Sequence, residues 1–429
     1  MKKISINLIS LGCSKNLVDS EKLLGQLPLE RYRLLHDSSE PSDVVIINTC
    51  GFIGDAKQES IDTILSYVRA KQLGSIRKLL VFGCLSQRYR EELSLEIPEV
   101  DAWFGVDQAE AICSWFDTKY EPDNMSRWLT TPSHYAYLKL GEGCNRRCSF
   151  CAIPLIRGAF RSVPVPRLVE EAKVLARKGV RELLLIAQDL SYYGRDIDGK
   201  SHLANLLDAL SEISEIQWIR LHYLYPANFP KDIIPIIKNN TKICRYLDMP
   251  LQHASDNILK SMRRGHDKKT MLKLIKDIRK QVPDIAIRTT MLVGFPGESP
   301  KDFSELMEFV KDVRFERLGV FTYSPEEGTN AYRMADTVST RLKSRRAETL
   351  MALQQELSLS LNEAKVGKVL KVIVDREEDD YFIGRTEYDS PEVDNEVLIE
   401  KEEGIVVGNF VVVRITGAGD FELTGVINQ

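Results

Sequence analysis

The sequence predicts an α/β protein of several domains that ends in a small antiparallel β-barrel. Three observations predict it. Apolar strand-like runs alternate with helical patterns over roughly the first three quarters of the 429 residues. Three early strands are each followed by a cysteine. From Val366 onward the pattern changes to short alternating strands with glycine-bearing turns. A chain of this length allows two to four domains.

The N-terminal region, residues 1–133, is predicted to form an α/β domain with a parallel sheet. Its strand-like runs cover 4–11, 43–49 and 78–82, and helical patterns follow at 16–27, 54–72 and 87–97. Each strand leads to one cysteine, namely Cys13, Cys50 and Cys84. Successive parallel strands end at the same edge of a sheet, so we expect three thiols on one rim. A metal cluster is the interpretation we favour; separate buried core thiols are the alternative.

A second α/β domain is predicted over residues 134–335, after a boundary near Ser133 in a weakly periodic segment. Six strand-like runs alternate there with six helical patterns, which predicts a parallel sheet that is closed or partly closed. The strands are expected at 135–140, 182–187, 217–224, 246–250, 285–293 and 318–323.

A helical connector is predicted over residues 336–365, where leucines recur near helical spacing. Residues 366–429 are predicted to form the C-terminal β-barrel from five short strands. We expect these strands at 368–374, 381–386, 396–400, 409–415 and 422–427.

The strongest functional signal is a cluster of three cysteines, Cys144, Cys148 and Cys151, directly after the first strand of the central domain. Thiolates select iron–sulfur clusters or zinc, and both normally take four protein ligands. A triplet without a fourth cysteine nearby therefore predicts a cluster with one open coordination position. A zinc knuckle completed by a distant residue is the alternative.

The CxxxCxxC triplet, with Phe150 before its last cysteine, resembles the radical S-adenosylmethionine enzymes. The order of three strand-end cysteines, this triplet and a small barrel is similar to that of their methylthiotransferase family. Four stretches, residues 13–19, 186–189, 248–255 and 323–329, look like the branch that modifies an aspartate of small-subunit ribosomal protein twelve. The resemblance covers essentially the whole chain. It implies a partial (β/α)6 radical S-adenosylmethionine barrel and a TRAM-like C-terminal barrel.

The resemblance also implies the chemistry. Cys144, Cys148 and Cys151 would hold a [4Fe–4S] cluster that cleaves S-adenosylmethionine, and Cys13, Cys50 and Cys84 would hold an auxiliary [4Fe–4S] cluster that carries sulfur. A methylthio group would be inserted at the unactivated β-carbon of the aspartate. The alternatives are methylthiolation of a tRNA adenosine and a non-catalytic iron–sulfur carrier. Cys113 and Cys244 are isolated in the sequence, and we expect them to be core thiols.

Two further groups of site residues are predicted. Phe150, Gln188 and Gly294 are expected to bind S-adenosylmethionine, because they lie at or after the ends of strands in the central domain. The C-terminal barrel is acidic: residues 364–429 hold seven Lys or Arg and fifteen Asp or Glu. This charge favours a basic protein over RNA as the substrate. We expect the substrate to contact four acidic side chains in one loop, Glu387, Asp389, Glu392 and Asp394.

The composition indicates where in the cell the protein is located. Eight cysteines in 429 residues are too few for a secreted disulfide scaffold, and no segment has the length and apolarity of a membrane span. We therefore expect a cytoplasmic monomer that does not bind a membrane. Its chemistry would also need a reductase or flavodoxin-like electron donor and a sulfur donor.

Overall fold

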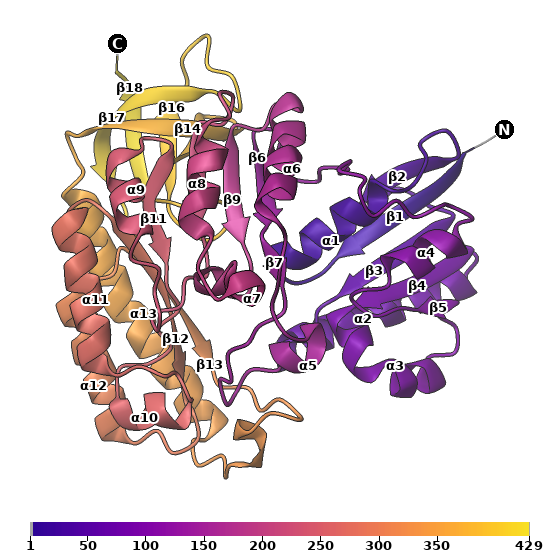
Figure 1. The fold of residues 1–429 in the computed structure, drawn as a ribbon, viewed down its shortest axis with the longest axis horizontal. Helices are drawn as coiled ribbons and strands as arrows, with labels where there is room; N and C mark the ends of the chain where they lie inside the picture. The colour runs from indigo at the N-terminus through magenta and orange to yellow at the C-terminus, as the bar shows by residue number, and fades with distance from the viewer. Residues whose placement is uncertain (1–2, 429) are drawn as a thin grey trace.

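The computed structural model describes residues 3–428, which contain two parallel sheets, a closed barrel and a short two-stranded sheet (Figure 1). The N-terminal sheet has five parallel strands in the order β2-β1-β3-β4-β5. From β1 the chain first adds β2 on one side and then β3, β4 and β5 on the other, so the strand order reverses between β1 and β3. Doubly wound folds place ligands at such a point, outside the carboxyl ends of the strands. The strands are β1 Ile4–Ser10, β2 Tyr32–His36, β3 Val44–Thr49, β4 Lys78–Gly83 and β5 Ala102–Trp103.

Helices connect these strands and cover both faces of the sheet. One hydrophobic core includes Ile6 and Leu80 and lies on the α1 and α4 side, and the other includes Ile47 and Val81 and lies on the α2 and α3 side. This alternation is expected of a sheet buried on both faces. The helices are α1 Ser14–Leu24, α2 Gly54–Gln72, α3 Cys84–Glu96 and α4 Ala109–Trp115.

The central domain is a curved sheet of six parallel strands in sequence order, and its first and last strands do not pair. It is therefore an open barrel. The strands are β6 Tyr135–Lys139, β9 Glu182–Ile186, β10 Trp218–Leu221, β11 Ile243–Asp248, β12 Ala286–Val293 and β13 Arg317–Thr322. A short antiparallel pair, β7 Gly141–Glu142 and β8 Arg161–Ser162, follows β6.

Helices pack on the outer face of this barrel, where Leu138 and Leu185 join residues of α6 and α8 in the largest core. The inner face of the first two strands carries Tyr137, Leu184 and Ile186, which pack against Val18 of α1. The N-terminal domain thus covers part of the barrel's inner face. The helices are α5 Ile153–Arg157, α6 Val165–Arg177, α7 Arg195–Asp198, α8 Leu203–Ser211, α9 Ile233–Asn239, α10 Asp256–Ser261, α11 Lys268–Gln281 and α12 Pro300–Val313.

A long helix, α13 Thr340–Glu363, leads to a closed five-stranded barrel with the strand order β14-β15-β16-β18-β17. Four of its strand pairs are antiparallel, as predicted, whereas β16 and β18 are parallel. The strands are β14 Val369–Glu377, β15 Tyr381–Thr386, β16 Glu396–Glu400, β17 Phe410–Ala418 and β18 Glu422–Ile427. No helix among residues 3–428 is long and apolar enough to cross a membrane.

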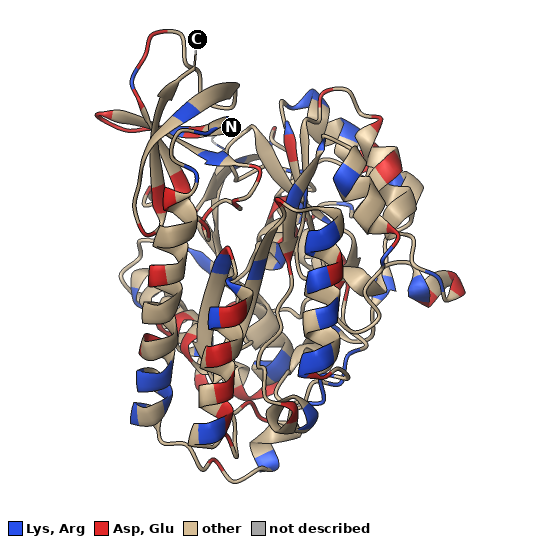
Figure 2. Cartoon of the chain, turned by 90° about the vertical axis from the view of Figure 1, so that its left-hand side faces the viewer, with Lys and Arg blue, Asp and Glu red and all other residues tan. Residues whose placement is uncertain are grey.

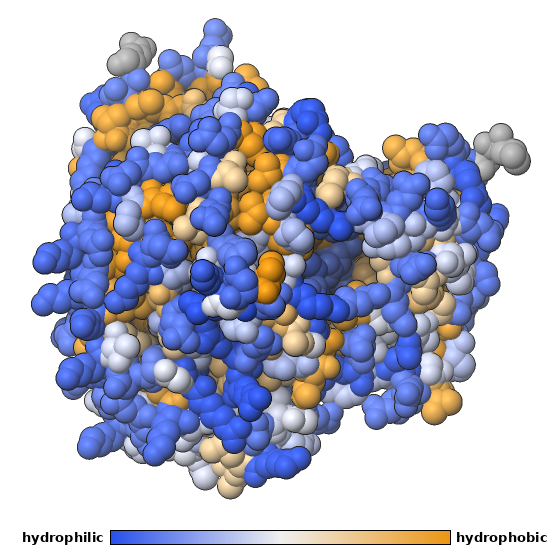
Figure 3. Space-filling view, viewed as in Figure 1, coloured by the Kyte–Doolittle hydropathy of each residue, from blue (hydrophilic) through white to orange (hydrophobic). Residues whose placement is uncertain are grey.

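The C-terminal barrel packs against the amino ends of the central strands, at the opposite end of β6 from β7 (Figure 1). The outer helices carry much of the surface charge, and Figure 2 shows the lysines and arginines along α11. Figure 3 shows a hollow in the surface between the N-terminal domain and the rest of the molecule.

Candidate functional site

The first cysteine set lies at the carboxyl ends of β1, β3 and β4, as predicted. Cys13 precedes α1, Cys50 follows β3, and Cys84 is the first residue of α3. The three thiols are close enough for the charges of Cys13 and Cys84 to raise the pKa of Cys50, although burial is the larger cause of its rise to about 12. Burial also raises the pKa of Cys84, whereas the charge of Lys15 helps to lower that of Cys13, so binding iron to Cys50 and Cys84 would release protons.

Two glycines let these strand ends approach one another. Gly12 has φ +88°, and a Cβ there would lie 2.7 Å from the Cβ and 2.8 Å from the sulfur of Cys50. Gly83 has φ +101°, and a Cβ there would lie 2.4 Å from the Asn48 Oδ1 atom. Only glycine fits both the left-handed backbone and the space.

The second cysteine set lies on the loop between β7 and α5. Cys144 is buried, and the Arg146 backbone N–H donates to its sulfur at 3.4 Å. Burial raises the pKa of Cys144 to about 11 and that of Cys151 to about 12, and the Cys148 charge adds to both shifts. The structure therefore contains both cysteine sets at the ends of strands where the sequence predicts them, and their role as cluster ligands stays a prediction. Cys113 and Cys244 are buried core residues, also as predicted.

Each cysteine set has an arginine that donates to one of its sulfurs. Arg264 donates through Nη1 to Cys148 at 3.2 Å, and its guanidinium stacks on Tyr225 with 4.1 Å to the ring centroid. Arg157 donates through Nη2 to Cys84 at 3.3 Å. Because Arg157 ends α5, directly after the second set, this side chain connects the two cysteine sets. Sequence patterns did not identify either arginine.

Arg157 belongs to a buried ionic network between the N-terminal and central domains. Its Nη1 donates to Asp19 at 2.9 Å and to Glu142 at 2.7 Å, and Lys139 also binds both carboxylates. Burial disfavours the charged form of Glu142, but Lys139 and Arg157 outweigh it and lower the pKa of Glu142 to about 2. The network holds α1 beside the second cysteine set.

The three residues predicted to bind S-adenosylmethionine lie at the carboxyl end of the central barrel. Phe150 packs edge-on against Phe295. Gln188 donates to Glu142 at 2.8 Å, whereas its own buried Oε1 has no protein partner. Gly294 has φ +75°, and a Cβ there would lie 2.3 Å from Lys343 Cγ, so α13 explains this glycine without a ligand.

Further buried polar atoms at this end of the barrel lack a protein partner. They include the Tyr323 hydroxyl, Arg264 Nε and both ring nitrogens of His266. Buried polar groups are normally satisfied, so such atoms are candidates for contact with a bound polar molecule. Together with Gln188 Oε1, they fit a polar cofactor next to Cys144, Cys148 and Cys151. Among residues 3–428, no three His, Cys, Asp or Glu side chains form a site for a single metal ion.

Most of the acidic side chains predicted to bind substrate instead contact other residues of this chain. Asp389 is 1% exposed and pairs with Arg317, while the Asp394 carboxylate pairs with Arg288 at 3.2 Å and accepts from the Tyr246 hydroxyl at 2.8 Å. Glu387 accepts from the Arg245 backbone N–H at 3.1 Å.

These partners lie on the central strands β11, β12 and β13. The prediction of a substrate surface is therefore wrong for Asp389 and Asp394, because their carboxylates neutralise buried arginines of the barrel. Counting charged residues in the sequence could not show that these carboxylates pair with arginines of the same chain. Glu392 is exposed, and its contact with substrate stays a prediction.

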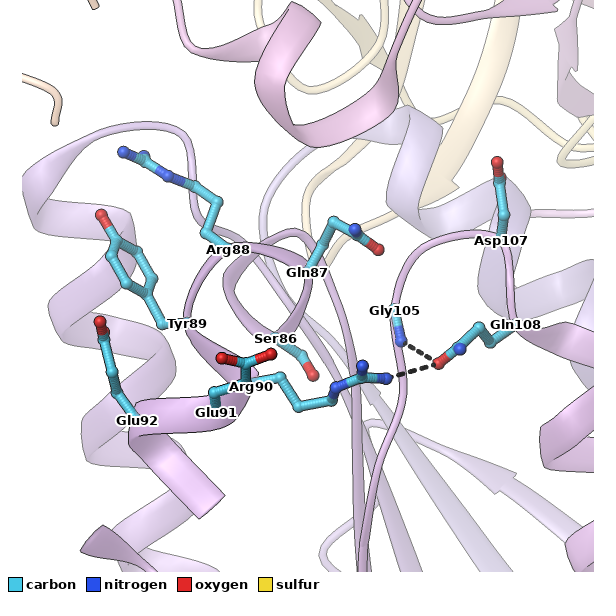
Figure 4. A pocket seen from close by; sticks show the side chains of 10 residues that line it. All are labelled: Ser86, Gln87, Arg88, Tyr89, Arg90, Glu91, Glu92, Gly105, Asp107 and Gln108. Atoms are coloured by element: carbon cyan, nitrogen blue, oxygen red, sulfur yellow. Dashed lines mark hydrogen bonds between the residues drawn. The ribbon is translucent and has the colours of Figure 1, made fainter. Parts of the chain in front are cut away.

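A polar pocket of about 360 Å³ lies on the outer side of α3 (Figure 4). Gln108 Oε1 accepts there from the Gly105 backbone N–H at 2.7 Å and from Arg90 at 3.3 Å. None of the six predicted cluster cysteines lines this pocket, so we do not assign the reaction to it.

Comparisons with known proteins agree with this arrangement. Family models match residues 138–310 as the radical SAM superfamily, 5–105 as uncharacterized protein family UPF0004 and 366–427 as a TRAM domain. A solved structure of the radical S-adenosylmethionine methyltransferase TsrM from Kitasatospora setae is similar in fold, with a TM-score of 0.54 and 12% identity. The match covers 86% of this chain and 81% of that one.

Curated relatives are similar over their whole length. The ribosomal protein uS12 methylthiotransferase RimO of Cytophaga hutchinsonii is 53% identical over 99% of this chain and 98% of its own. The enzyme of the same name from Christiangramia forsetii is 51% identical over 99% of this chain and 94% of its own. The chain therefore belongs to the ribosomal protein uS12 methylthiotransferase family, within the radical SAM superfamily.

Proposed function

We propose that this chain inserts a methylthio group at the β-carbon of an aspartate in ribosomal protein uS12. The observation that carries the proposal is the pair of three-cysteine sets, joined through Arg157 in a chain about half identical to curated uS12 methylthiotransferases. Enzymes of the radical SAM superfamily use one [4Fe–4S] cluster with S-adenosylmethionine. The second cluster, on Cys13, Cys50 and Cys84, is part of our proposal.

The donor set fits two iron–sulfur clusters. Cys144, Cys148 and Cys151 would hold the cluster that binds S-adenosylmethionine, and Cys13, Cys50 and Cys84 would hold the auxiliary cluster. When bound, these groups supply the sulfur, the methyl group and the radical that removes hydrogen from an unactivated carbon. No side-chain base could deprotonate such a carbon.

The chain's own residues position and shield these groups. Arg264 and Arg157 each donate a charge-assisted hydrogen bond to one sulfur, that of Cys148 and that of Cys84, which orients these sulfurs. Phe150, Gln188 and Gly294 would line the S-adenosylmethionine site. The ionic network of Arg157, Asp19 and Glu142 would keep both sets facing one space and limit the entry of water.

We propose the remaining partners from the chemistry. Reductive cleavage needs an electron donor such as a flavodoxin-like protein or a reductase, and repeated turnover needs a sulfur donor. We propose that the chain acts as a monomer in the cytoplasm.

Mass spectrometry of cells that lack this protein tests the proposal. Ribosomal protein uS12 from those cells should lose one methylthio group, and tRNA should keep all of its methylthio adenosines. The outcome that contradicts the proposal is an unchanged uS12 together with tRNA that has lost the modification, which would assign the chain to tRNA.

A further inference from the structure

Lys15 is a buried cation without a carboxylate partner. It lies in the first turn of α1, two residues after Cys13, and is 8% exposed. An unpaired buried charge is costly. Seven buried lysines or arginines elsewhere in the chain form ion pairs with Asp or Glu, and among residues 3–428 only Lys15 and Arg264 do not. The paired residues are Arg127, Arg157, Arg220, Arg317, Lys343, Arg346 and Arg385.

The nearby cysteines do not fully account for the buried positive charge of Lys15. Arg264 donates to the sulfur of Cys148, and Arg157 to that of Cys84. Lys15 acts on the Cys13 thiol through its charge, but its ammonium group lies over a different residue, the Tyr223 ring, at 3.5 Å from the centroid. An ammonium group has three N–H donors and can bind a further anion from that position.

Tyr223 is held in an unusual backbone conformation. It follows β10 at the carboxyl end of the central barrel and has φ +60°, which non-glycine residues seldom adopt. Such strain concentrates at functional sites because the surrounding structure must hold it. Tyr223 packs against a cluster that joins Val18 of α1 to residues of β6 and β9, at the contact between the two domains.

We infer that Lys15, seated on Tyr223, binds the side-chain carboxylate of the substrate aspartate. The amino end of α1 also favours an anion there. A carboxylate held at Lys15 lies beside Cys13, and the carbon to be modified is bonded directly to that carboxyl group. The inference deepens the proposed function and rests on it. It also explains selectivity, because an adenosine base offers no carboxylate to this site.

Binding of ribosomal protein uS12 to the iron-loaded full chain tests the inference. Two forms of uS12 are compared: the parent, and one in which the aspartate found modified by mass spectrometry is changed to Asn. The parent chain should bind the Asp form about 10- to 100-fold more tightly, as expected for a hydrogen bond between charged groups. The variant Lys15→Met keeps the length of the side chain and should lose this preference, whereas Lys15→Arg should keep most of it.

Lys22→Gln is the matched control. Lys22 lies on the same helix but pairs with Glu171, so removing its charge should leave the preference for the Asp form at the parent value. If Lys15→Met still prefers the Asp form, or instead weakens only the binding of S-adenosylmethionine, the inference is overturned.

A second measurement needs no variant of the chain. A carbodiimide joins an amine to a carboxylate only where the two are in contact, so it should link Lys15 of the parent chain to the Asp form of uS12 and not to the Asn form. Cross-links to uS12 that never include Lys15 would overturn the inference. If the parent chain neither binds nor modifies uS12, the proposed function fails; if it modifies uS12 without dependence on Lys15, only this inference fails.

Discussion

At the scale of single residues, Arg157 has the most consequential contacts. Its guanidinium neutralises Asp19 and Glu142 and donates to Cys84 in the protein interior. Removing one partner of a buried ionic network leaves the other charges without compensation. No local sequence signal marks Arg157, because its partners lie up to 141 residues away in the chain.

We predict that Arg157→Met lowers the free energy of unfolding of the iron-free protein by about 3–5 kcal/mol. Arg161→Met is the control, because Arg161 forms an exposed pair with Asp107, and should cost at most about 1 kcal/mol. Denaturant titration of both variants measures the difference. Equal losses would show that the buried network does not stabilise the domain contact.

Two histidines, the buried His253 and the half-buried His266, predict a dependence of stability on pH. Burial lowers the pKa of His253 to about 4 and that of His266 to about 3, from 6.5. Below pH 6.5 the unfolded chain therefore binds protons that the folded chain does not. Their contribution to stability is complete above pH 6.5 and falls by about 1.4 kcal/mol per pH unit for each histidine as the pH drops towards 4.

Denaturant titrations of the iron-free protein at pH 7, 6 and 5 measure this slope. The double variant His253→Asn and His266→Asn should show a flatter dependence than the parent. A parent and a double variant that lose stability in parallel would contradict the assigned cause.

At the scale of elements, the ends of the strands in the N-terminal sheet form the proposed auxiliary site. Gly12 packs directly against Cys50, so we predict that Gly12→Ala displaces this cysteine and removes about half of the bound iron. Gly74→Ala is the matched control, since Gly74 also has a positive φ, +74°, but has no atom within 4 Å of an added Cβ. Iron analysis after reconstitution compares them, and full iron in Gly12→Ala would refute the prediction.

The loop between β15 and β16 fixes the C-terminal barrel to the central one. We predict that Asp389→Asn costs about 3–5 kcal/mol, because Arg317 is left without its anion in a buried position. Glu392→Gln, at an exposed position, should cost little. Thermal unfolding tests the pair. An Asp389→Asn chain of parent stability with weaker binding of uS12 would instead restore the interpretation of Asp389 as a substrate contact.

Many of the elements could be predicted because their patterns are local. The strands that lead to Cys13, Cys50 and Cys84 have long apolar runs, and the structure contains them within a few residues. The strand β2 was not predicted, because Arg33 and His36 interrupt its short apolar pattern. Cys144, Cys148 and Cys151 could be proposed from their spacing, and Cys13, Cys50 and Cys84 from their positions at strand ends, whereas Lys15 and Tyr223 meet only through the contact of two domains.

At the scale of the whole molecule, several contacts hold the N-terminal domain against the barrel. Arg127, in the segment between the domains, binds Glu21 and Glu171, and Glu326, after β13, accepts from Lys57 and Arg88. Glu326 belongs to a stretch that indicated the ribosomal-protein branch. We propose that these contacts keep the two cysteine sets facing one space, where the sulfur and the radical would reach the same carbon of the substrate.

The central claim is that two clusters share one reaction on uS12. The most direct test incubates iron-loaded protein with S-adenosylmethionine, a reductant, a sulfide source and purified uS12, and then measures the mass of uS12. The parent should add one methylthio group in place of one hydrogen. A variant with Cys13, Cys50 and Cys84 changed to Ala should still cleave S-adenosylmethionine but leave uS12 unmodified. Methylthio transfer by that variant, or a parent that modifies tRNA and not uS12, would contradict the account.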